Sequence, residues 1–124
     1  MNMNLVVVAG KLAAPPELRE FESGSRMLRS LVTVRSDAPR RRVDVLPITL
    51  WDPEADHELI DAPVGKGVWV VGSVQRRFWS ATEGRRSRLE IVAHHMELRN
   101  DETVATAGDS EPLVAAAGGE RRVE

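Results

Sequence analysis

Residues 65–90 read GKGVWVVGSVQRRFWSATEGRRSRLE, and this stretch decides which fold we expect. Inside it, a β-branched run over 68–77 alternates in side-chain character, which predicts a strand with two different faces. The tip of the stretch is Glu83-Gly84, and glycine readily takes the positive φ that hairpin tips need. A second strand is predicted over 86–96. The stretch therefore indicates two antiparallel strands joined by a tight hairpin.

Three segments upstream also have β-strand character. The run over 5–9 is β-branched, 27–35 alternates between a mostly apolar and a mixed face, and 43–51 is a third such run. Gly10 and Gly72 lie inside strands, where glycine marks a sharp bend or the close approach of another strand. Together with the hairpin, these segments predict five strands.

The connections narrow the choice of architecture. The acidic segment over 54–61 is predicted to form one or two helical turns between the third and fourth strands. Pro47 lacks an amide donor, so we expect it at a sheet edge or a bulge. An all-β chain of five strands, with bend glycines and this helix, has the element order of the OB-fold, a small closed barrel. A five-stranded roll of another topology has the same order, because element order does not fix topology.

The chain divides into a domain and a tail. Residues 1–99 carry all the predicted elements, whereas 100–124 has no periodicity and is rich in Ala, Gly and Glu, which is typical of disorder. The first 100 residues carry 15 basic and 13 acidic side chains, and the last 24 carry 2 and 6. Because the arginines cluster in 26–42 and 76–88, the domain can present a basic face although the net charge is −2.

The composition argues against metal sites and catalysis. The chain has no cysteine, which excludes disulfides and thiolate metal sites. His94 and His95 are adjacent on a predicted strand and should point to opposite faces, so we expect no metal site. The carboxylates of 52–61 have no nucleophile or phosphate-binding loop beside them in the sequence. We therefore predict neither an enzyme nor a bound cofactor.

No membrane or export segment is expected. No apolar run approaches the roughly 20 residues that a membrane helix needs. The opening MNMNLVVVAGKL lacks the basic region and the long apolar stretch of a signal peptide. A cytoplasmic location follows as the expectation.

The hairpin segment RRFWSATEGRRSR, residues 76–88, holds five arginines and two aromatic residues. Cations beside flat rings suit a flexible anion with flat faces, which describes single-stranded nucleic acid. The same composition also describes an exposed hairpin whose charges serve only solubility. The segment by itself leaves both interpretations open.

Four stretches resemble the bacterial single-stranded DNA-binding proteins: 3–12, 16–24, 65–74 and 77–86. The resemblance covers about residues 3–98 in element order. It implies an OB-fold, usually assembled as a homotetramer, that binds single-stranded DNA without much sequence preference. Such a protein acts in replication, repair or recombination, and its location would be the cytoplasm, associated with the nucleoid.

The chain departs from this family in three places. It ends in GGERRVE rather than in the short acidic, apolar tip that recruits replication proteins in many members, so we do not expect recruitment by the tail. The loop over 36–42 is short, and Val45 stands where members often present an aromatic residue. These departures keep two alternatives open: a specialised OB-fold relative, such as a primosomal accessory or RNA-binding protein, and an OB module that binds only proteins.

The aromatic residues receive different roles. Trp79, in the arginine-rich hairpin, matches a base-stacking position of the family, and the alternative is a partly buried anchor. Trp51 also matches a stacking position, and its alternative is a cap on the core over the short helix. Trp69 should point outward with Val71, on the face that makes subunit contacts in the family. Phe78 should alternate with Trp79 and pack inward.

Arginines are the expected phosphate contacts, because each neutralised phosphate releases counterions. The alternative for each one is an ordinary solvated surface charge. The short loop adds Arg40, Arg41 and Arg42 to the basic surface. The predicted DNA-binding arginines lie on the second strand and around the hairpin: Arg29, Arg35, Arg76, Arg77, Arg85, Arg86 and Arg88.

Overall fold

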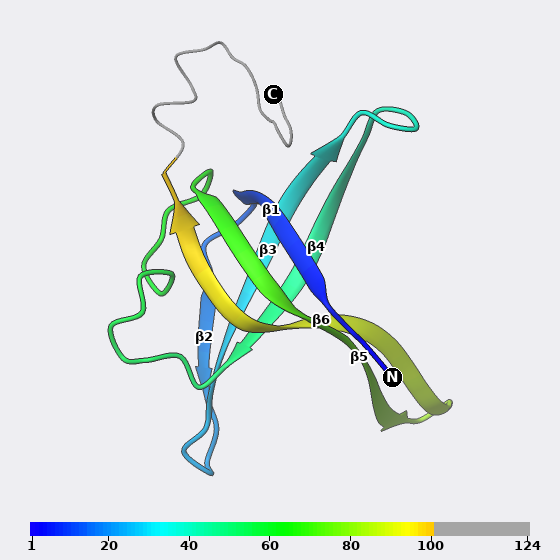
Figure 1. The fold of residues 1–124 in the computed structure, drawn as a ribbon. Coiled ribbons are helices and arrows are strands. Elements are labelled where there is room, and N and C mark those ends of the chain that lie inside the picture. The colour runs from blue at the N-terminus through cyan, green and yellow to red at the C-terminus, as the bar shows by residue number, and fades with distance from the viewer. Residues whose placement is uncertain (101–124) are drawn as a thin grey trace.

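The computed structural model describes residues 1–100, and these form an all-β domain (Figure 1). The predicted disordered tail lies outside the described residues, so the division of the chain at residue 99 stays a prediction. No helix long and apolar enough to cross a membrane was found among residues 1–100. The strands are β1 Val6–Leu12, β2 Glu17–Glu20, β3 Arg26–Ser36, β4 Arg42–Trp51, β5 Gly67–Ala81 and β6 Gly84–Arg99.

The sheet closes on itself. Its strand order is β1-β5-β6-β4-β3-β2, and β1 also pairs with β3. The pairing of β4 with β6 is parallel, at Ile48 with Ile91 and Thr49 with Val92, and the other pairings are antiparallel. Strands β1, β5, β6, β4 and β3 therefore form the predicted five-stranded barrel. Pro47 pairs with Leu31 of β3 and precedes the two residues of β4 that pair with β6. At Pro47 itself β4 therefore has only β3 as a neighbour, and the edge position predicted for it is correct.

Strand β2 is a sixth strand of the described residues that was not predicted from the sequence. It pairs with β3 from Glu17 opposite Arg29 to Glu20 opposite Arg26. The end of β1 occupies the same edge of β3 further along, at Thr33 and Val32. The two strands β1 and β2 therefore pair with the same edge of β3, separated by a short connection. All four residues of β2 are exposed, so no apolar alternation marked it as a strand.

The core fills the barrel with aliphatic side chains. Leu28 and Val32, on the face of 27–35 predicted to point inward, are fully buried, and so are Val68 and Val70. Burying a side chain of this size contributes about 1.5–3 kcal/mol. The alternation in 27–35 and at the start of 68–77 thus correctly predicted which residues face the core.

Gly10 and Gly72 stand where two backbones approach closely. A Cβ atom at Gly10 would lie 2.2 Å from the carbonyl oxygen of Thr33, and one at Gly72 would lie 2.1 Å from that of Val92. Gly72 also adjoins a shift in register between β5 and β6. Both glycines therefore lie where another strand approaches closely, which is one of the two roles predicted for them.

The helix predicted over 54–61 is wrong. The segment forms turns instead. The side chain of Leu59 is fully buried in the barrel, and the Leu59 amide donates a hydrogen bond to His57 Nδ1 at 3.1 Å. That bond competes with a helical ladder. The turns are closed by amides that donate to the carbonyl three residues earlier: His57 to Glu54 at 3.0 Å, Ile60 to His57 at 3.1 Å and Ala62 to Leu59 at 3.3 Å.

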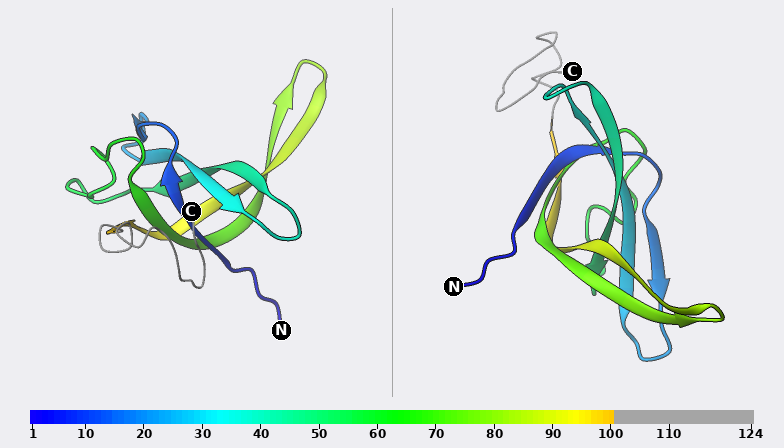
Figure 2. Two further views of the ribbon diagram at one scale, coloured as in Figure 1. Left: turned by 90° about the horizontal axis from the view of Figure 1, so that it is seen from above. Right: turned by 90° about the vertical axis from the view of Figure 1, so that its right-hand side faces the viewer.

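The hairpin of β5 and β6 extends well past the barrel, as both views in Figure 2 show. Its last pair is Ala81 with Gly84, and Gly84 has a φ of 114°. The two-residue tip is therefore Thr82-Glu83, one residue before the predicted Glu83-Gly84, while the positive φ expected at Gly84 is confirmed. The strands are longer than the sequence indicated, with 15 residues in β5 and 16 in β6. Residues 75–90 are called the β5–β6 hairpin below.

Candidate nucleic-acid interface

The register of the β5–β6 hairpin divides its residues between two faces. Residues opposite each other in an antiparallel pair project to the same side. Arg77 opposite Arg88 and Trp79 opposite Arg86 therefore share one face. The Arg88 guanidinium lies 5.7 Å from the centre of the Trp79 ring, which fits this assignment.

The other face of the hairpin carries Phe78 and two of the predicted DNA-binding arginines. The Arg85 guanidinium lies 4.5 Å from the centre of the Phe78 ring, and Arg76 Nη1 donates to Ser87 Oγ at 3.1 Å. Phe78 is 51 % exposed, so the expectation that it packs inward is wrong. It does alternate with Trp79, but the hairpin lies beyond the barrel and no core lies beneath either ring.

Trp79 lines a groove of about 320 Å³ between the hairpin and the outer side of the sheet. Of the predicted residues, the groove contains Trp79, Arg29, Arg77 and Arg88. Arg19, Phe21 and Met27 also line the groove and were not predicted. The complete lining, called the arginine groove below, is Arg19, Phe21, Met27, Arg29, Arg77, Trp79 and Arg88.

Pairing between β2, β3 and β4 explains why the missed residues belong to the groove. Arg19 lies opposite Met27, and Met27 lies opposite Trp51, so these three form one row across the outer face. Arg29 belongs to the next row of the same face, opposite Glu17. Arg19 and Phe21 could have been assigned to the groove from the sequence only if β2 had been predicted as a strand.

The arginine groove is strongly basic. Arg77 pairs with Glu90 at 3.6 Å, which offsets one charge. Within residues 1–100, no carboxylate lies within ion-pair distance of Arg19, Arg29 or Arg88. Three guanidinium groups thus face the groove without an acidic partner from the described residues, an arrangement that favours a polyanion.

Trp51 lies beside the groove and contacts Phe21. Their ring centres are 5.8 Å apart and the planes are inclined by 33°. Trp51 is 39 % exposed. Residues 54–61 form turns and no helix, so the part of the alternative interpretation in which Trp51 covers a helix is wrong. A stacking role for Trp51 stays a prediction, as it does for Trp79.

Other predicted arginines lie away from the groove. Arg35 is on the same outer face as Arg29 but six residues along β3, or about 20 Å at roughly 3.3 Å per residue. Arg86 is on the groove side of the hairpin and forms an ion pair with Glu83 near the tip. The structure therefore brings together only part of the predicted set.

The loop beside Arg35 is less basic than its sequence suggests. Arg42 and Asp44 form two hydrogen bonds, from Nε at 3.1 Å and from Nη2 at 2.9 Å. This hydrogen bonding lowers the pKa of the Asp44 carboxyl and raises the pKa of the Arg42 guanidinium. Both groups stay charged at neutral pH and offset each other. Arg41 Nε also lies 4.0 Å from Asp37 Oδ1, so Arg40 is the one arginine of this loop without an ion pair among residues 1–100.

Trp69 and Val71 point outward, as predicted. The flanking Val68 and Val70 are fully buried, while Trp69 is 42 % exposed. Val71 is partly buried and lies opposite Val7 of β1, which is exposed. This apolar surface belongs to the part of β5 that precedes Gly72, whereas the arginine groove uses the part that follows it. A subunit contact here stays a prediction.

The two histidines are arranged differently from the prediction. His95 pairs with Val71 and Ala93 pairs with Gly72, so His94 is the extra residue of a bulge. The bulge breaks the alternation on which the argument rested, and both side chains are exposed. His95 Nε2 lies 2.9 Å from Glu97 Oε1. Residues 1–100 contain no group of three or more side chains able to hold a metal ion.

Comparison with known proteins shows which family the chain is similar to. Residues 3–99 match the model of the single-strand binding protein family. The chain belongs to this family. "Single-stranded DNA-binding protein 1" of Nostoc sp. is 30 % identical over 115 residues, covering 90 % of this chain and 95 % of the relative. "Single-stranded DNA-binding protein 3" of Clostridium acetobutylicum is 32 % identical over 101 residues, covering 77 % and 69 %. The predicted family membership is thus confirmed.

A solved structure shows the same fold. The Plasmodium falciparum SSB, in a complex with ssDNA, superposes with a TM-score of 0.67 at 16 % identity. The match covers 81 % of this chain and 97 % of that one. The predicted OB-fold is therefore confirmed, apart from the helix over 54–61.

Proposed function

We propose that this protein binds single-stranded DNA without strong sequence preference. The observation that carries the proposal is the arginine groove, in which an exposed tryptophan and four arginines line one hollow. Membership of the single-strand binding protein family supports it. The protein acts as a binding protein rather than an enzyme, in replication, repair or recombination of cytoplasmic, nucleoid-associated DNA.

The two kinds of side chain have separate tasks in this proposal. Arg19, Arg29 and Arg88 attract the phosphates, and this attraction acts on any polyanion. The ring of Trp79 accepts a base only when that base is unpaired. Stacking contributes about 1–3 kcal/mol per base and tolerates any sequence, because every base has a π-face. The ring therefore makes the single strand the preferred ligand.

We also propose a homotetramer that uses the apolar surface of Val7, Trp69 and Val71. An exposed row of this kind across β1 and β5 is typical of a contact between subunits. Trp69→Glu places a charge in the row and should shift the protein toward smaller species in light scattering. A wild-type protein that is monomeric at micromolar concentration would contradict the assembly without touching DNA binding.

Titration of the intrinsic tryptophan fluorescence with oligo-dT tests DNA binding. We expect saturable quenching by oligo-dT, much weaker binding of a duplex of equal length, and a steep loss of affinity as salt rises. Oligo-rU is the third ligand. Tighter binding of oligo-rU would favour the RNA-binding relative, and no binding of any strand would favour the module that binds only proteins.

A further inference from the structure

The hairpin between β2 and β3, residues 17–29, places an aromatic side chain that has no assigned role. Phe21 follows β2 directly, and its amide donates to the carbonyl of Ser25 at 2.9 Å. Gly24, with a φ of 97°, donates to the Phe21 carbonyl at 2.9 Å. The turn is therefore tight, and it fixes the backbone of Phe21 on both of its hydrogen-bonding groups.

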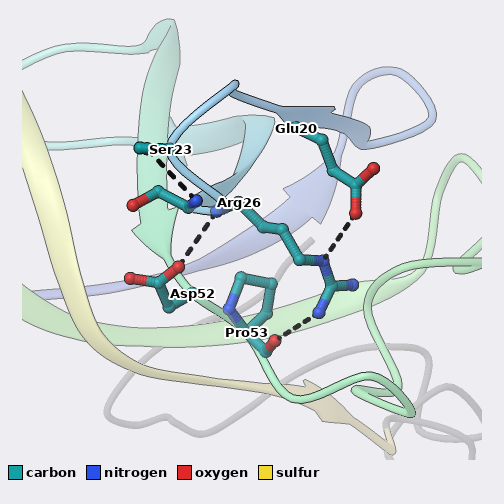
Figure 3. A network of polar contacts seen from close by, with 6 residues as sticks. Glu20, Ser23, Arg26, Asp52 and Pro53 are labelled. Carbon is teal, nitrogen blue, oxygen red and sulfur yellow. Dashed lines mark hydrogen bonds and ion pairs between the residues drawn. The ribbon is translucent and has the colours of Figure 1, made fainter.

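Arg26 holds this hairpin against the end of β4 (Figure 3). Its amide donates to Asp52 Oδ1 at 2.9 Å, and its guanidinium donates to the Pro53 carbonyl at 3.0 Å. The Asp52 amide returns a bond to the Arg26 carbonyl at 2.7 Å, and Glu20 approaches the guanidinium at 4.0 Å. The chain just after Trp51 is thus tied to the hairpin that carries Phe21.

Phe21 contacts Trp51 and lines the arginine groove, where Trp79 lies on the other wall. It is 41 % exposed. A ring that served only to anchor the hairpin would gain by burying more of its surface. Its neighbour in the groove is Arg19, two residues earlier on the same face of the hairpin. The wall formed by β2 and β3 therefore has the same components as the wall formed by the β5–β6 hairpin: a ring and a cation.

We propose that Phe21 is a third base-stacking platform, and that Arg19 contacts the phosphate beside it. The single strand then passes between two walls that each offer a ring, rather than over one wall. This inference rests on the proposed binding of single-stranded DNA. It assigns direct contact with DNA to the β2–β3 hairpin.

Photo-crosslinking with oligo-dT that carries 5-iodouracil tests the contact directly, since trypsin separates the aromatic residues of interest. Cleavage after Arg19 and Arg26 releases peptide 20–26, in which Phe21 is the single aromatic residue. Trp51 is in peptide 43–66 and Trp79 is in 78–85. Peptide 67–76 carries Trp69 and serves as the control that should stay free of DNA.

We expect adducts on peptide 20–26 as well as on 78–85. Adducts confined to 43–66 and 78–85 would overturn the inference and leave DNA binding intact. If the wild-type protein binds no single strand in the fluorescence titration, both the proposed function and this inference fail. The two failures are therefore distinguishable within one set of experiments.

Two substitutions separate stacking from packing. Phe21→Leu keeps an apolar contact with Trp51 but removes the π-face, and it should weaken oligo-dT binding roughly 5- to 150-fold. Phe21→Tyr keeps the ring and should bind as the wild type does. Phe78→Leu, on the hairpin face away from the groove, is the matched control without effect. An unchanged affinity for Phe21→Leu, with wild-type melting temperature, would show that Phe21 only packs.

Discussion

The two hairpins that border the arginine groove are built in opposite ways. The β2–β3 hairpin is short, and Arg26 ties it to the turn after β4 through three hydrogen bonds with Asp52 and Pro53. The β5–β6 hairpin reaches beyond the barrel, and its outer residues 75–90 are exposed almost throughout. One wall is thus held by bonds to the barrel, whereas the other depends on its own strand pairing. The proposed path of the single strand therefore runs between a fixed wall and a projecting one.

The most severe test of the projecting wall is Trp79→Ala. Loss of the stacking ring should cost about 1–3 kcal/mol of oligo-dT binding free energy. The salt dependence should hardly change, because no cation is removed. Fluorescence anisotropy of a labelled oligonucleotide at several salt concentrations measures both quantities. Trp79→Phe, which keeps a ring, is the control. If Trp79→Ala retains its affinity but melts early, the ring is an anchor of the hairpin.

The fixed wall is tested by Arg26→Ala. Removal of the guanidinium loses its bond to the Pro53 carbonyl, and a hydrogen bond to a charged group contributes about 1.5–3 kcal/mol. Because Arg26 is partly exposed, we expect the lower end of that range in the free energy of unfolding, measured with urea. Binding should weaken slightly as well, since the hairpin that carries Phe21 keeps only two of its three hydrogen bonds to the turn after Trp51. Unchanged stability would show that the hairpin does not depend on this residue.

The smallest expected effect concerns the two faces of the projecting wall. Arg88→Ala should lower the slope of log K against log salt by about 0.7, the value for one phosphate of a single strand. Arg76→Ala removes the same charge from the face away from the groove and should leave the slope nearly unchanged. Equal changes for the two variants would mean that DNA contacts both faces.

Much of the fold was predictable because it depends on local patterns. Alternation from Val68 to Val71 correctly separated the inward from the outward side chains, and Glu83-Gly84 located the hairpin tip to within one residue. Gly10 and Gly72 were recognisable because few positions other than bends require glycine inside a strand. Each of these signals is contained within a few residues of sequence.

The errors concern features that depend on distant neighbours. Strand β2 exists because its backbone finds the edge of β3, and nothing in the four residues ELRE predicts that partner. The segment over 54–61 is held by the burial of Leu59 in the barrel rather than by helical propensity. Phe78 was placed inward because alternation states which face a residue occupies but not where the core ends.

The candidate site was predicted only in part, because some of its residues are positioned by local register and others by a strand that was not predicted. Trp79, Arg77 and Arg88 share a face because of the hairpin register, which the two-residue tip determines. That register could also have separated Arg76 and Arg85 from the rest. Arg19 and Phe21 could not be found, because their place in the groove follows from a strand that was not recognised.

The parallel pairing of β4 with β6 has a consequence for how the chain folds during synthesis. Ile48 meets Ile91 and Thr49 meets Val92, so the barrel closes only when the last strand arrives (Figure 1). Any sheet that β1, β3 and β4 form before β6 has been made has free edges, because β6 pairs with both β4 and β5 in the finished barrel. Barrels dominated by such distant pairings fold slowly, on the order of milliseconds to seconds. Until β6 leaves the ribosome, the apolar side chains that it covers in the finished barrel lack that cover, and we expect the chain to be most prone to aggregation during this interval.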